Sequence, residues 1–493
     1  MIKRLLILLI LLVAVPCWGF DINTTNCDDS DATTFCIQTS ELIVDGGANA
    51  SGKGRCNDSY TTYYGANFTV CDSGDTLYIE GSVSARGQLQ LLNFDGAGEY
   101  ITVTNDPTAE APRAYLSAGG AGALYIKDCK YLNVTGNANS AYTYGIYIVN
   151  TTATTGVKVL VESDHIKLGY LEITQSDPNS GTRNGIAVTD VNTITSWTYD
   201  TFEIHHNYIH DVSYTGMYLG HNKPHLGVDD DCAGDDCPYT KDFSIHDNLF
   251  EDIGSYALNL KGVEAGSTAN YIYDNIIRPS DRTSGGGYST GLVYDTDPRV
   301  AGTYLVWAGI RPKHLYAGAQ VQVYGNWVEK TRGIGIEIMS ENVLVYDNTV
   351  LNCGDNEWFY TQAGIGIEKN NLDGEAAQTP QIYDNIIVES VGYGIIGLDN
   401  VDSLGYLQRN IITESTVGER WGGGLTEGTG ANANVYQADT DSICFTTWSD
   451  DSDYSNDDFT LCCDYDYTSI AANACGATTT PVSGVKFNGA EYN

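Results

Sequence analysis

A short phrase that ends in asparagine recurs along the chain, and this repeat restricts the fold more than any other feature of the sequence. The clear copies are IHHN ending at Asn207, IHDN at Asn248, IYDN at Asn275, VYGN at Asn326, VYDN at Asn348 and IYDN at Asn385. A weaker copy, YLQRN, ends at Asn410. Consecutive clear copies are 22 to 51 residues apart, so the shortest interval approximates one unit and the excess is inserted loops. Such self-similarity is typical of a solenoid.

Aliphatic and ring-bearing residues alternate inside each copy. The residue three places before the asparagine is Ile or Val, and the residue two places before it is His or Tyr. This alternation predicts a strand with the aliphatic side chain inward and the ring outward. A short apolar strand follows the asparagine, and a third strand follows a small residue. These small residues are Gly216, Ala257, Gly291, Gly335, Gly366 and Gly394. Three short strands per turn predict an all-β parallel β-helix with coils about 4.8 Å apart.

The repeated polar and ring-bearing residues have structural roles in this arrangement. We interpret the asparagines as an internal ladder whose side-chain amides hydrogen-bond to the turn backbone of their own and adjacent coils. The His and Tyr residues form an outward row, which fits either a stack that stiffens the solenoid or a surface for sugar rings. His205 occupies a ring position, so packing is favoured over metal binding for this residue.

The repeated phrase, with a Gly-Ile after it, resembles the right-handed parallel β-helix superfamily, the pectate-lyase-like fold. The stretches GDTLYIEGSVS (74–84), YITVTND (100–106) and YLNVTGN (131–137) resemble its first coils. The resemblance covers about residues 70–415 and implies a right-handed helix. It leaves the chemistry open, because the superfamily includes polysaccharide lyases, glycoside hydrolases, epimerases and non-catalytic adhesion proteins. The chain lacks G-H-G and R-I-K, which disfavours a hydrolase of the polygalacturonase type.

The two ends of the chain differ from the repeats. Two basic residues precede an apolar run over 5–15, which predicts a signal peptide over 1–19 and a secreted protein. We expect a Cys-containing cap over 20–70 and the β-helix over 71–415. A Cys-rich cap over 416–493 is expected to protect the open edge of the last coil.

The number of cysteines predicts disulfides. Removal of Cys17 with the signal peptide leaves 12 of the 13 cysteines, an even number in an exported chain. Cys232 and Cys237 are close enough in sequence for a local bridge. The cysteines expected to hold the C-terminal cap are Cys444, Cys462, Cys463 and Cys475.

The charge of the chain disfavours several classes of partner. The formal net charge is −38, from 63 acidic and 25 basic residues. Nucleic acid and anionic membranes are disfavoured, because both bind cationic surfaces. An acidic polysaccharide is also disfavoured unless calcium or a local basic patch offsets the charge. Beyond the signal peptide no stretch is apolar enough to span a bilayer. We expect a monomer with a polysaccharide partner.

Alternation along the third strand predicts two outward rows of side chains, with neighbours in a row on successive coils. The first expected row is Ala187, Tyr218, Asn259, Val293, Glu337, Glu368 and Ile396. The second expected row is Thr189, Gly220, Lys261, Asp295, Met339, Asn370 and Leu398. Lys261 is therefore expected beside Asn259 and near Asp295 of the next coil.

Lys261 is the leading candidate for a catalytic base. The phrase ALNLKG resembles the strand that holds the base in one group of β-helix pectate lyases. In such lyases a basic residue removes the proton α to a uronate carboxylate. That role needs a lysine whose pKa is lowered by burial or by nearby cations. The alternative is an exposed ion pair with Asp295, which would raise the pKa of Lys261 instead.

An acidic insertion over 221–242 precedes the coil of Lys261. Inserted loops on one side of a repeat array commonly form a binding wall. Hard oxygen ligands crowded into a short span favour calcium as a cofactor. The candidate ligands are Asp229, Asp230 and Asp231, together with Asp295. A solvated acidic loop is the alternative.

A second insertion, over 278–320, concentrates basic residues that are rare elsewhere in the chain. Arg282 and Arg311 are its candidates for binding a substrate carboxylate through two hydrogen bonds.

Glu337 and Glu368 each end a GIGIE phrase and are expected on successive coils. Two ionised carboxylates at that spacing repel, so one pKa is expected to rise. The pair fits the acid and base of a glycosidase or a shared cation, with a solvated stack as the alternative. The expected substrate-binding residues are Tyr218, Asn259, His221, Glu337 and Glu368.

The leading hypothesis is a secreted, carbohydrate-active protein, a polysaccharide lyase that cleaves an acidic polysaccharide by β-elimination. Lys261 is its expected base, and Arg282 or Arg311 its expected carboxylate partner. Two alternatives stay open. One is a glycoside hydrolase that uses Glu337 and Glu368. The other is a non-catalytic extracellular surface or adhesion protein that uses the solenoid as a spacer.

Overall fold

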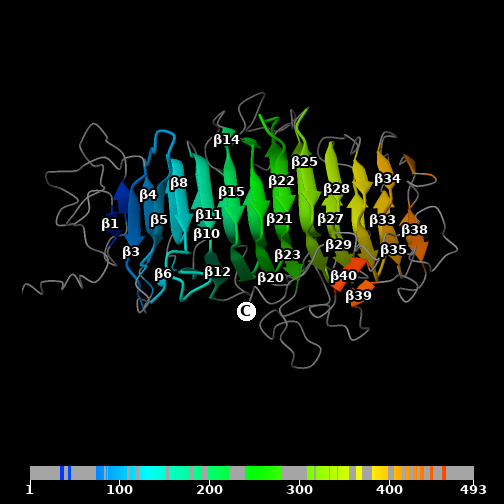
Figure 1. The fold of residues 1–493 in the computed structure, drawn as a ribbon, viewed down its shortest axis with the longest axis horizontal. Helices are drawn as coiled ribbons and strands as arrows, with labels where there is room; N and C mark the ends of the chain where they lie inside the picture. Colours follow the sequence, from blue (N-terminus) through cyan, green and yellow to red (C-terminus); the bar gives the residue numbers. More distant parts are fainter. Residues whose placement is uncertain are drawn as a thin grey trace, which may run out of the picture.

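The protein is a right-handed parallel β-helix, a rod in which short strands stack in three sheets (Figure 1). In Figure 1 the strands lie across the long axis, and their colours follow the sequence from blue at one end to orange at the other. The computed structural model describes residues 34–37, 43–45, 74–82, 85, 87–107, 112–117, 122–151, 155–160, 163–176, 183–189, 198–220, 239–278, 308–315, 318–331, 333–340, 342–354, 362–368, 380–397, 405–413, 415, 418–421, 426–427, 429, 434–437, 445–447 and 458–461. The predicted fold class is confirmed.

Each coil contributes one strand to each of three parallel sheets, here named A, B and C. Sheet A contains β1 (Thr34–Ile37), β3 (Thr76–Ile79), β5 (Ile101–Asn105), β8 (Lys130–Thr135), β11 (Asp164–Gly169), β15 (Phe202–His205), β19 (Ser244–His246), β22 (Asn270–Tyr273), β25 (Val321–Tyr324), β28 (Val343–Tyr346), β31 (Gln381–Tyr383), β34 (Tyr406–Gln408) and β37 (Thr426–Glu427). Sheet C contains β6 (Ala114–Ser117), β9 (Ile146–Asn150), β12 (Leu171–Gln175), β16 (Tyr208–Val212), β20 (Leu249–Ile253), β23 (Ile276–Arg278), β26 (Trp327–Glu329), β29 (Thr349–Leu351), β32 (Ile386–Val388), β35 (Ile411–Thr413) and β38 (Val435–Gln437).

Sheet B forms the third face of the rod. It contains β2 (Ile43–Asp45), β4 (Leu89–Leu92), β7 (Leu124–Lys127), β10 (Thr155–Val159), β13 (Asn184–Val188), β17 (Thr215–Leu219), β21 (Tyr256–Val263), β24 (Ala308–Leu315), β27 (Ile334–Ile338), β30 (Ala363–Ile367), β33 (Tyr393–Gly397) and β36 (Gly418–Trp421). Off this path, β14 (Thr198–Asp200) pairs with β18 (Tyr239–Lys241), which also pairs with β21. The antiparallel pair of β39 (Phe445–Thr447) and β40 (Asp458–Leu461) lies outside the three sheets.

The core is built from rows of aliphatic side chains that stack coil upon coil. In sheet A one such row consists of Ile204, Ile245, Ile272, Val323, Val345 and Ile382, all fully buried and paired in register. A single coil cannot cover its own apolar side, so each coil depends on its neighbours for burial. The predicted inward position of the β-branched residues is confirmed.

The asparagines form the predicted internal ladder. Each side-chain Nδ2 donates to the Oδ1 of the next asparagine at 2.8–3.0 Å, from Asn207 through Asn410 to Asn434. From Asn207 to Asn410, the residue before each of these asparagines has a left-handed backbone, as at Asp247 with φ of 53°. Asp, His and Gly tolerate this conformation better than most residues, which explains the D, H or G in the repeated phrase.

The outward rings of sheet A stack on one another. The row runs through His205, His246, Tyr273, Tyr324, Tyr346 and Tyr383, with ring centroids 4.7–5.3 Å apart and interplanar angles of 10° or less. Each ring therefore packs against the ring of the next coil, which supports the stiffening role. A role in sugar binding stays a prediction.

Two expectations about the third strand are wrong. The strand beside β21 is β24, so Arg311 and Lys313 occupy the positions expected for Val293 and Asp295. The pattern starting at Gly291 was misleading because Gly-Leu-Val at 291–293 resembles the start of a third strand, whereas the strand that pairs with β21 begins at Ala308. Glu337 of β27 lies opposite Gly366 of β30, so Glu368 belongs to the row of Met339. The repeated GIGIE phrases are thus offset by two residues in register.

Other predictions concern segments with few described residues. The cysteines expected to form disulfides in the 221–242 loop and the C-terminal cap lie outside the described residues. Cys129 and Cys353 are buried core thiols, and each donates to backbone carbonyl oxygens. Among the residues described, the structure contains no helix long and apolar enough to cross a bilayer.

Candidate functional site

Polar and charged side chains gather on the outer face of sheet B. The residues are Tyr218 of β17, Asn259 and Lys261 of β21, Arg311 and Lys313 of β24, and Glu337 of β27. We call this set the sheet B cluster. Successive residues within a strand alternate between core and surface, so the neighbouring residues Leu258 and Ile310 enter the core. Three of the 25 basic residues of an acidic chain thus meet within two adjacent strands.

Lys261 lies among cations. It pairs in register with Lys313, while Asn259 pairs with Arg311 on the same two strands. The Lys261 Nζ also lies 5.4 Å from the centroid of the Tyr218 ring. Burial first, and then the charges of Lys313 and Arg311, lower the pKa of Lys261 to about 7. A substantial fraction of Lys261 is therefore neutral near pH 7, as a general base requires.

Gly220 lets the backbone of Lys261 approach the preceding coil. Gly220 has φ of +84°, and a Cβ added there would lie 1.5 Å from the carbonyl oxygen of Lys261. A side chain at Gly220 would collide with that strand and also strain its own backbone. This glycine therefore helps to define where Lys261 sits on the sheet.

Arg311 is held from three sides. Its Nε lies 3.0 Å from Glu337 Oε2. Its Nη1 donates to the hydroxyl of Tyr256, and its guanidinium carbon lies 4.6 Å from the centroid of that ring. The Met339 sulfur accepts from Nη2 at 2.8 Å. Arg311 is partly buried, so these contacts fix a planar group with its charge close to Lys261.

Glu337 and Glu368 interact although they are not direct register partners. Burial raises the pKa of Glu337 to about 7, the charge of Arg311 opposes the rise, and the charge and hydrogen bond of Glu368 add to it. The expectation that one pKa of the pair rises is confirmed. The expected placement at one strand spacing in a single row is corrected by the register of β27 and β30.

Asn259 has an unused hydrogen-bond acceptor. The residue is 2% exposed, and its Oδ1 accepts no hydrogen bond within the part of the chain that the structure describes. A buried acceptor without a donor is unfavourable, so this atom is suited to a donor from a bound molecule or from an inserted segment. Its role in substrate binding stays a prediction.

Several predicted site residues lie outside the described residues. These are His221, Asp229, Asp230, Asp231, Arg282 and Asp295. Their roles in calcium or substrate binding stay predictions. The expected ion pair of Lys261 with Asp295 has no support in the register, because Lys313 occupies that position in the next coil.

Lys313 and Tyr256 were missed as site residues from the sequence. The signal for Lys313 was present, because AGIRPKHL alternates apolar and basic residues between Ile310 and Lys313. The signal for Tyr256 was absent, since its contact with Arg311 joins residues 55 apart.

Comparisons with known proteins support the fold. The sequence matches no protein-family model and no curated protein. A GH136 lacto-N-biosidase from Eubacterium ramulus is similar in structure, with a TM-score of 0.50, 14% identity, and coverage of 83% of this chain and 68% of that chain. An alginate lyase from Paenibacillus sp. has a TM-score of 0.37 and 13% identity, covering 74% of this chain and 89% of that chain.

A third similar structure is the tailspike protein of E. coli bacteriophage HK620 in complex with a pentasaccharide. Its TM-score is 0.40 at 12% identity, and the match covers 82% of this chain and 59% of the tailspike chain. At such low identity the similarity concerns the fold alone. The function must be argued from the site.

Proposed function

We propose that the protein is carbohydrate-active and, more specifically, a polysaccharide lyase that cleaves an acidic polysaccharide by β-elimination. The observation that supports this most is the position of Lys261 beside Lys313 and Arg311, with a pKa lowered to about 7. Lys313 and Arg311, which add to the effect of burial on the pKa of Lys261, are also the groups that would attract a substrate carboxylate. The sheet B cluster thereby supplies both a base and positive charge for the substrate carboxylate.

The proposed reaction begins with proton removal. Neutral Lys261 takes the proton from the carbon α to the uronate carboxylate, and the developing negative charge spreads onto that carboxylate. Arg311 and Lys313 stabilise this charge. The bond from the adjacent carbon to the glycosidic oxygen then breaks, a carbon–carbon double bond forms, and the departing oxygen takes up a proton.

Local charge explains how an acidic protein could bind an acidic polymer. The net charge of −38 repels anions at long range, but salt screens this repulsion beyond about 10 Å at 0.1 M ionic strength. Close to sheet B, Arg311 and Lys313 supply positive charge beside Lys261, and the raised pKa of Glu337 reduces the negative charge of the nearby carboxyl groups. The calcium expected at the 221–242 loop would add to this effect.

A glycoside hydrolase is the second candidate, favoured by the raised pKa of Glu337. A carboxyl group with a pKa of about 7 is suited to donate a proton to a glycosidic oxygen. Glu337 and Glu368, however, are hydrogen-bonded to each other, whereas hydrolases separate their two carboxyl groups by about 5 Å or more. The lyase therefore fits the geometry better.

The experiment is a substrate panel. The secreted protein is incubated with pectin, alginate and glycosaminoglycans, each with calcium and with a chelator. Ultraviolet absorbance from a new unsaturated bond is the expected result and identifies a lyase. New reducing ends without that absorbance would identify a hydrolase and reject the proposal. No product on any substrate would favour a non-catalytic surface or adhesion protein.

A further inference from the structure

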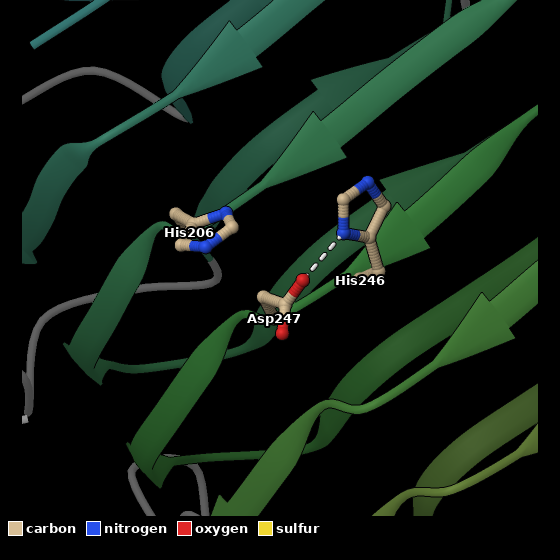
Figure 2. Close-up of side chains that lie close together, drawn as sticks. All are labelled: His206, His246 and Asp247. Atoms are coloured by element: carbon tan, nitrogen blue, oxygen red, sulfur yellow. Dashed lines mark hydrogen bonds and ion pairs between the residues drawn. The ribbon is translucent and has the colours of Figure 1, made fainter. Parts of the chain in front are cut away.

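Two histidines and an aspartate converge where β15 and β19 end, on a different sheet from the sheet B cluster (Figure 2). One ring nitrogen from each of His206 and His246 and one carboxylate oxygen of Asp247 all lie within 4.8 Å of one another. All three side chains are partly exposed, so the site is open to ions from solvent. We propose that His206, His246 and Asp247 bind a divalent transition-metal ion of the zinc type.

The fold brings these residues together by stacking two turns. His205 pairs in register with His246, and the ladder contact of Asn207 with Asn248 places His206 beside Asp247. His206 and Asp247 both have left-handed backbones, with φ of 51° and 53°. Their side chains therefore leave the same position of two successive turns.

The chemistry of the donors selects the class of metal. Two imidazoles and one carboxylate suit Zn²⁺, Co²⁺ or Ni²⁺, whereas Ca²⁺ and Mg²⁺ prefer oxygen ligands alone. At the corresponding turn position the four coils after that of Asp247 have Asp274, Gly325, Asp347 and Asp384. None of these is histidine, so His206 distinguishes its turn from the four that follow.

The distances are near those that a metal needs. His246 Nδ1 lies 2.7 Å from Asp247 Oδ2 (Figure 2). Ligands bound at about 2.0–2.2 Å in a tetrahedral arrangement lie about 3.3 Å apart. Small rotations of partly exposed side chains can bring the three atoms to this spacing. The ion would replace the proton that His246 and Asp247 otherwise share.

Neighbouring groups orient the proposed ligands. His246 Nε2 lies 3.5 Å from Glu203 Oε1, so a carboxylate faces the ring nitrogen that the metal would leave unused. This arrangement of carboxylate, histidine and metal recurs at protein metal sites and fixes the ring orientation. Lys167 in turn holds Glu203 at 2.6 Å. His205 Nδ1 lies 3.0 Å from His206 Nδ1.

The ring stack of sheet A accounts for only part of this cluster. Stacking explains the parallel rings of His205 and His246, with centroids 5.3 Å apart. His206 lies outside that row: it stacks on Tyr170, with ring centroids 4.8 Å apart, and its ring plane is 84° from that of His246. A bound ion would join two coils at this point and so stabilise the rod locally.

The test is metal titration of the full chain after removal of bound metal with a chelator. Co²⁺ serves as the spectroscopic probe and Zn²⁺ as the competitor. We expect one equivalent of Co²⁺ to give visible d–d bands without the near-ultraviolet band of thiolate ligands, and Zn²⁺ to abolish them. Zn²⁺ should also raise the melting temperature by about 5 °C, whereas Ca²⁺ should not.

Substitutions test which residues bind the metal. His206→Gln and Asp247→Asn should each weaken binding at least about tenfold, and asparagine still tolerates the left-handed turn at 247. His165→Gln is the matched control, because His165 also has a left-handed φ of 53° and a partner, Asp164, at 2.9 Å. It should bind the metal as the wild type does.

Three results would overturn the proposal. These are the absence of a saturable equivalent, binding unchanged in both His206→Gln and Asp247→Asn, and equal loss in His165→Gln. Thermal melting of each variant in the presence of chelator shows whether the variant is folded. If a variant is not folded, His246→Gln is used in its place. The readouts are independent of enzyme activity, so they stand whether or not the protein is a lyase.

Discussion

Lys261 of β21 and Lys313 of β24 are register partners on adjacent strands, so two positive charges share the outer face of sheet B. Like charges at this distance destabilise each other, and the pKa of Lys261 falls to about 7, chiefly because the residue is buried and further because of Lys313 and Arg311. Such an arrangement costs folding stability. An unfavourable placement of charge that persists in a folded protein is a candidate for function.

The rate of cleavage should rise with pH through the pKa of Lys261. Below pH 7 the lysine is protonated and cannot accept a proton, and above pH 7 it is neutral. We expect kcat/KM on the acidic polysaccharide to increase about tenfold per pH unit below pH 6 and to level off above about pH 8. A pH–rate profile measures this. A rate that is independent of pH between 5 and 8 would contradict a lysine base.

The lowered pKa of Lys261 should also make the free energy of unfolding depend on pH. Because the folded pKa of Lys261 is below its unfolded value of about 10.4, the unfolded state binds more protons between pH 7 and 10. The contribution of Lys261 to the free energy of unfolding therefore rises with pH over this window. Lys261→Met should be more stable than the wild type at pH 6, and the difference should shrink at pH 9. Urea denaturation at both pH values measures it, and parallel curves would refute the lowered pKa.

Gly220 should be needed for the position of Lys261. Gly220→Ala places a methyl group 1.5 Å from the Lys261 carbonyl oxygen, so the strand must shift. We expect a loss of more than about 2 kcal/mol in the free energy of unfolding and a marked loss of activity. Gly318→Ala is the control, because Gly318 has φ of +87° but open space where the Cβ would be. Equal losses in both variants would show that φ alone matters.

The asparagine ladder should contribute strongly to stability. Asn326 donates to the carbonyls of Ile272 and Tyr324 and to Asn348, and its Oδ1 accepts from Asn275. Asn326→Ala leaves several of these buried groups without partners, and we expect a loss of about 3 kcal/mol in the free energy of unfolding.

The control for this substitution is Asn133→Ala, at a partly exposed position of β8. It should change the free energy of unfolding by less than about 0.5 kcal/mol. Urea denaturation of both variants gives the comparison. A loss below 1 kcal/mol for Asn326→Ala would contradict a structural role for the ladder.

The fold was predictable because its signal is repeated. Each copy of the phrase predicts the same strand, turn and strand. Alignment of the copies then predicts the contact between Asn248 and Asn275. Parallel strands from successive coils pair by stacking, so the aligned residues become neighbours. The inward Ile and Val rows and the outward rings were predicted for the same reason.

The site was predictable only in part, because insertions interrupt the repeat. Lys261 and Arg311 are both predicted site residues, but Arg311 is predicted in an inserted loop, because the sequence pattern places the third strand of the next coil at Gly291 instead of Gly309. Periodicity fixes which face a residue occupies, not how long an insertion lasts before the strand resumes. Glu368 is likewise out of the predicted register, because it lies two residues beyond the position opposite Glu337. The His206 cluster was missed because its members meet only through the left-handed turns.

The most direct measurement of the central claim is the elimination rate of Lys261→Ala on the polysaccharide that the wild type cleaves. Lys167→Ala is the control, a lysine on sheet A that pairs with Glu203. We predict that Lys261→Ala lowers the rate of unsaturated-product formation at least about 10²-fold, while Lys167→Ala retains the wild-type rate. Formation of the unsaturated product by Lys261→Ala at the wild-type rate would contradict the proposal that this lysine is the base.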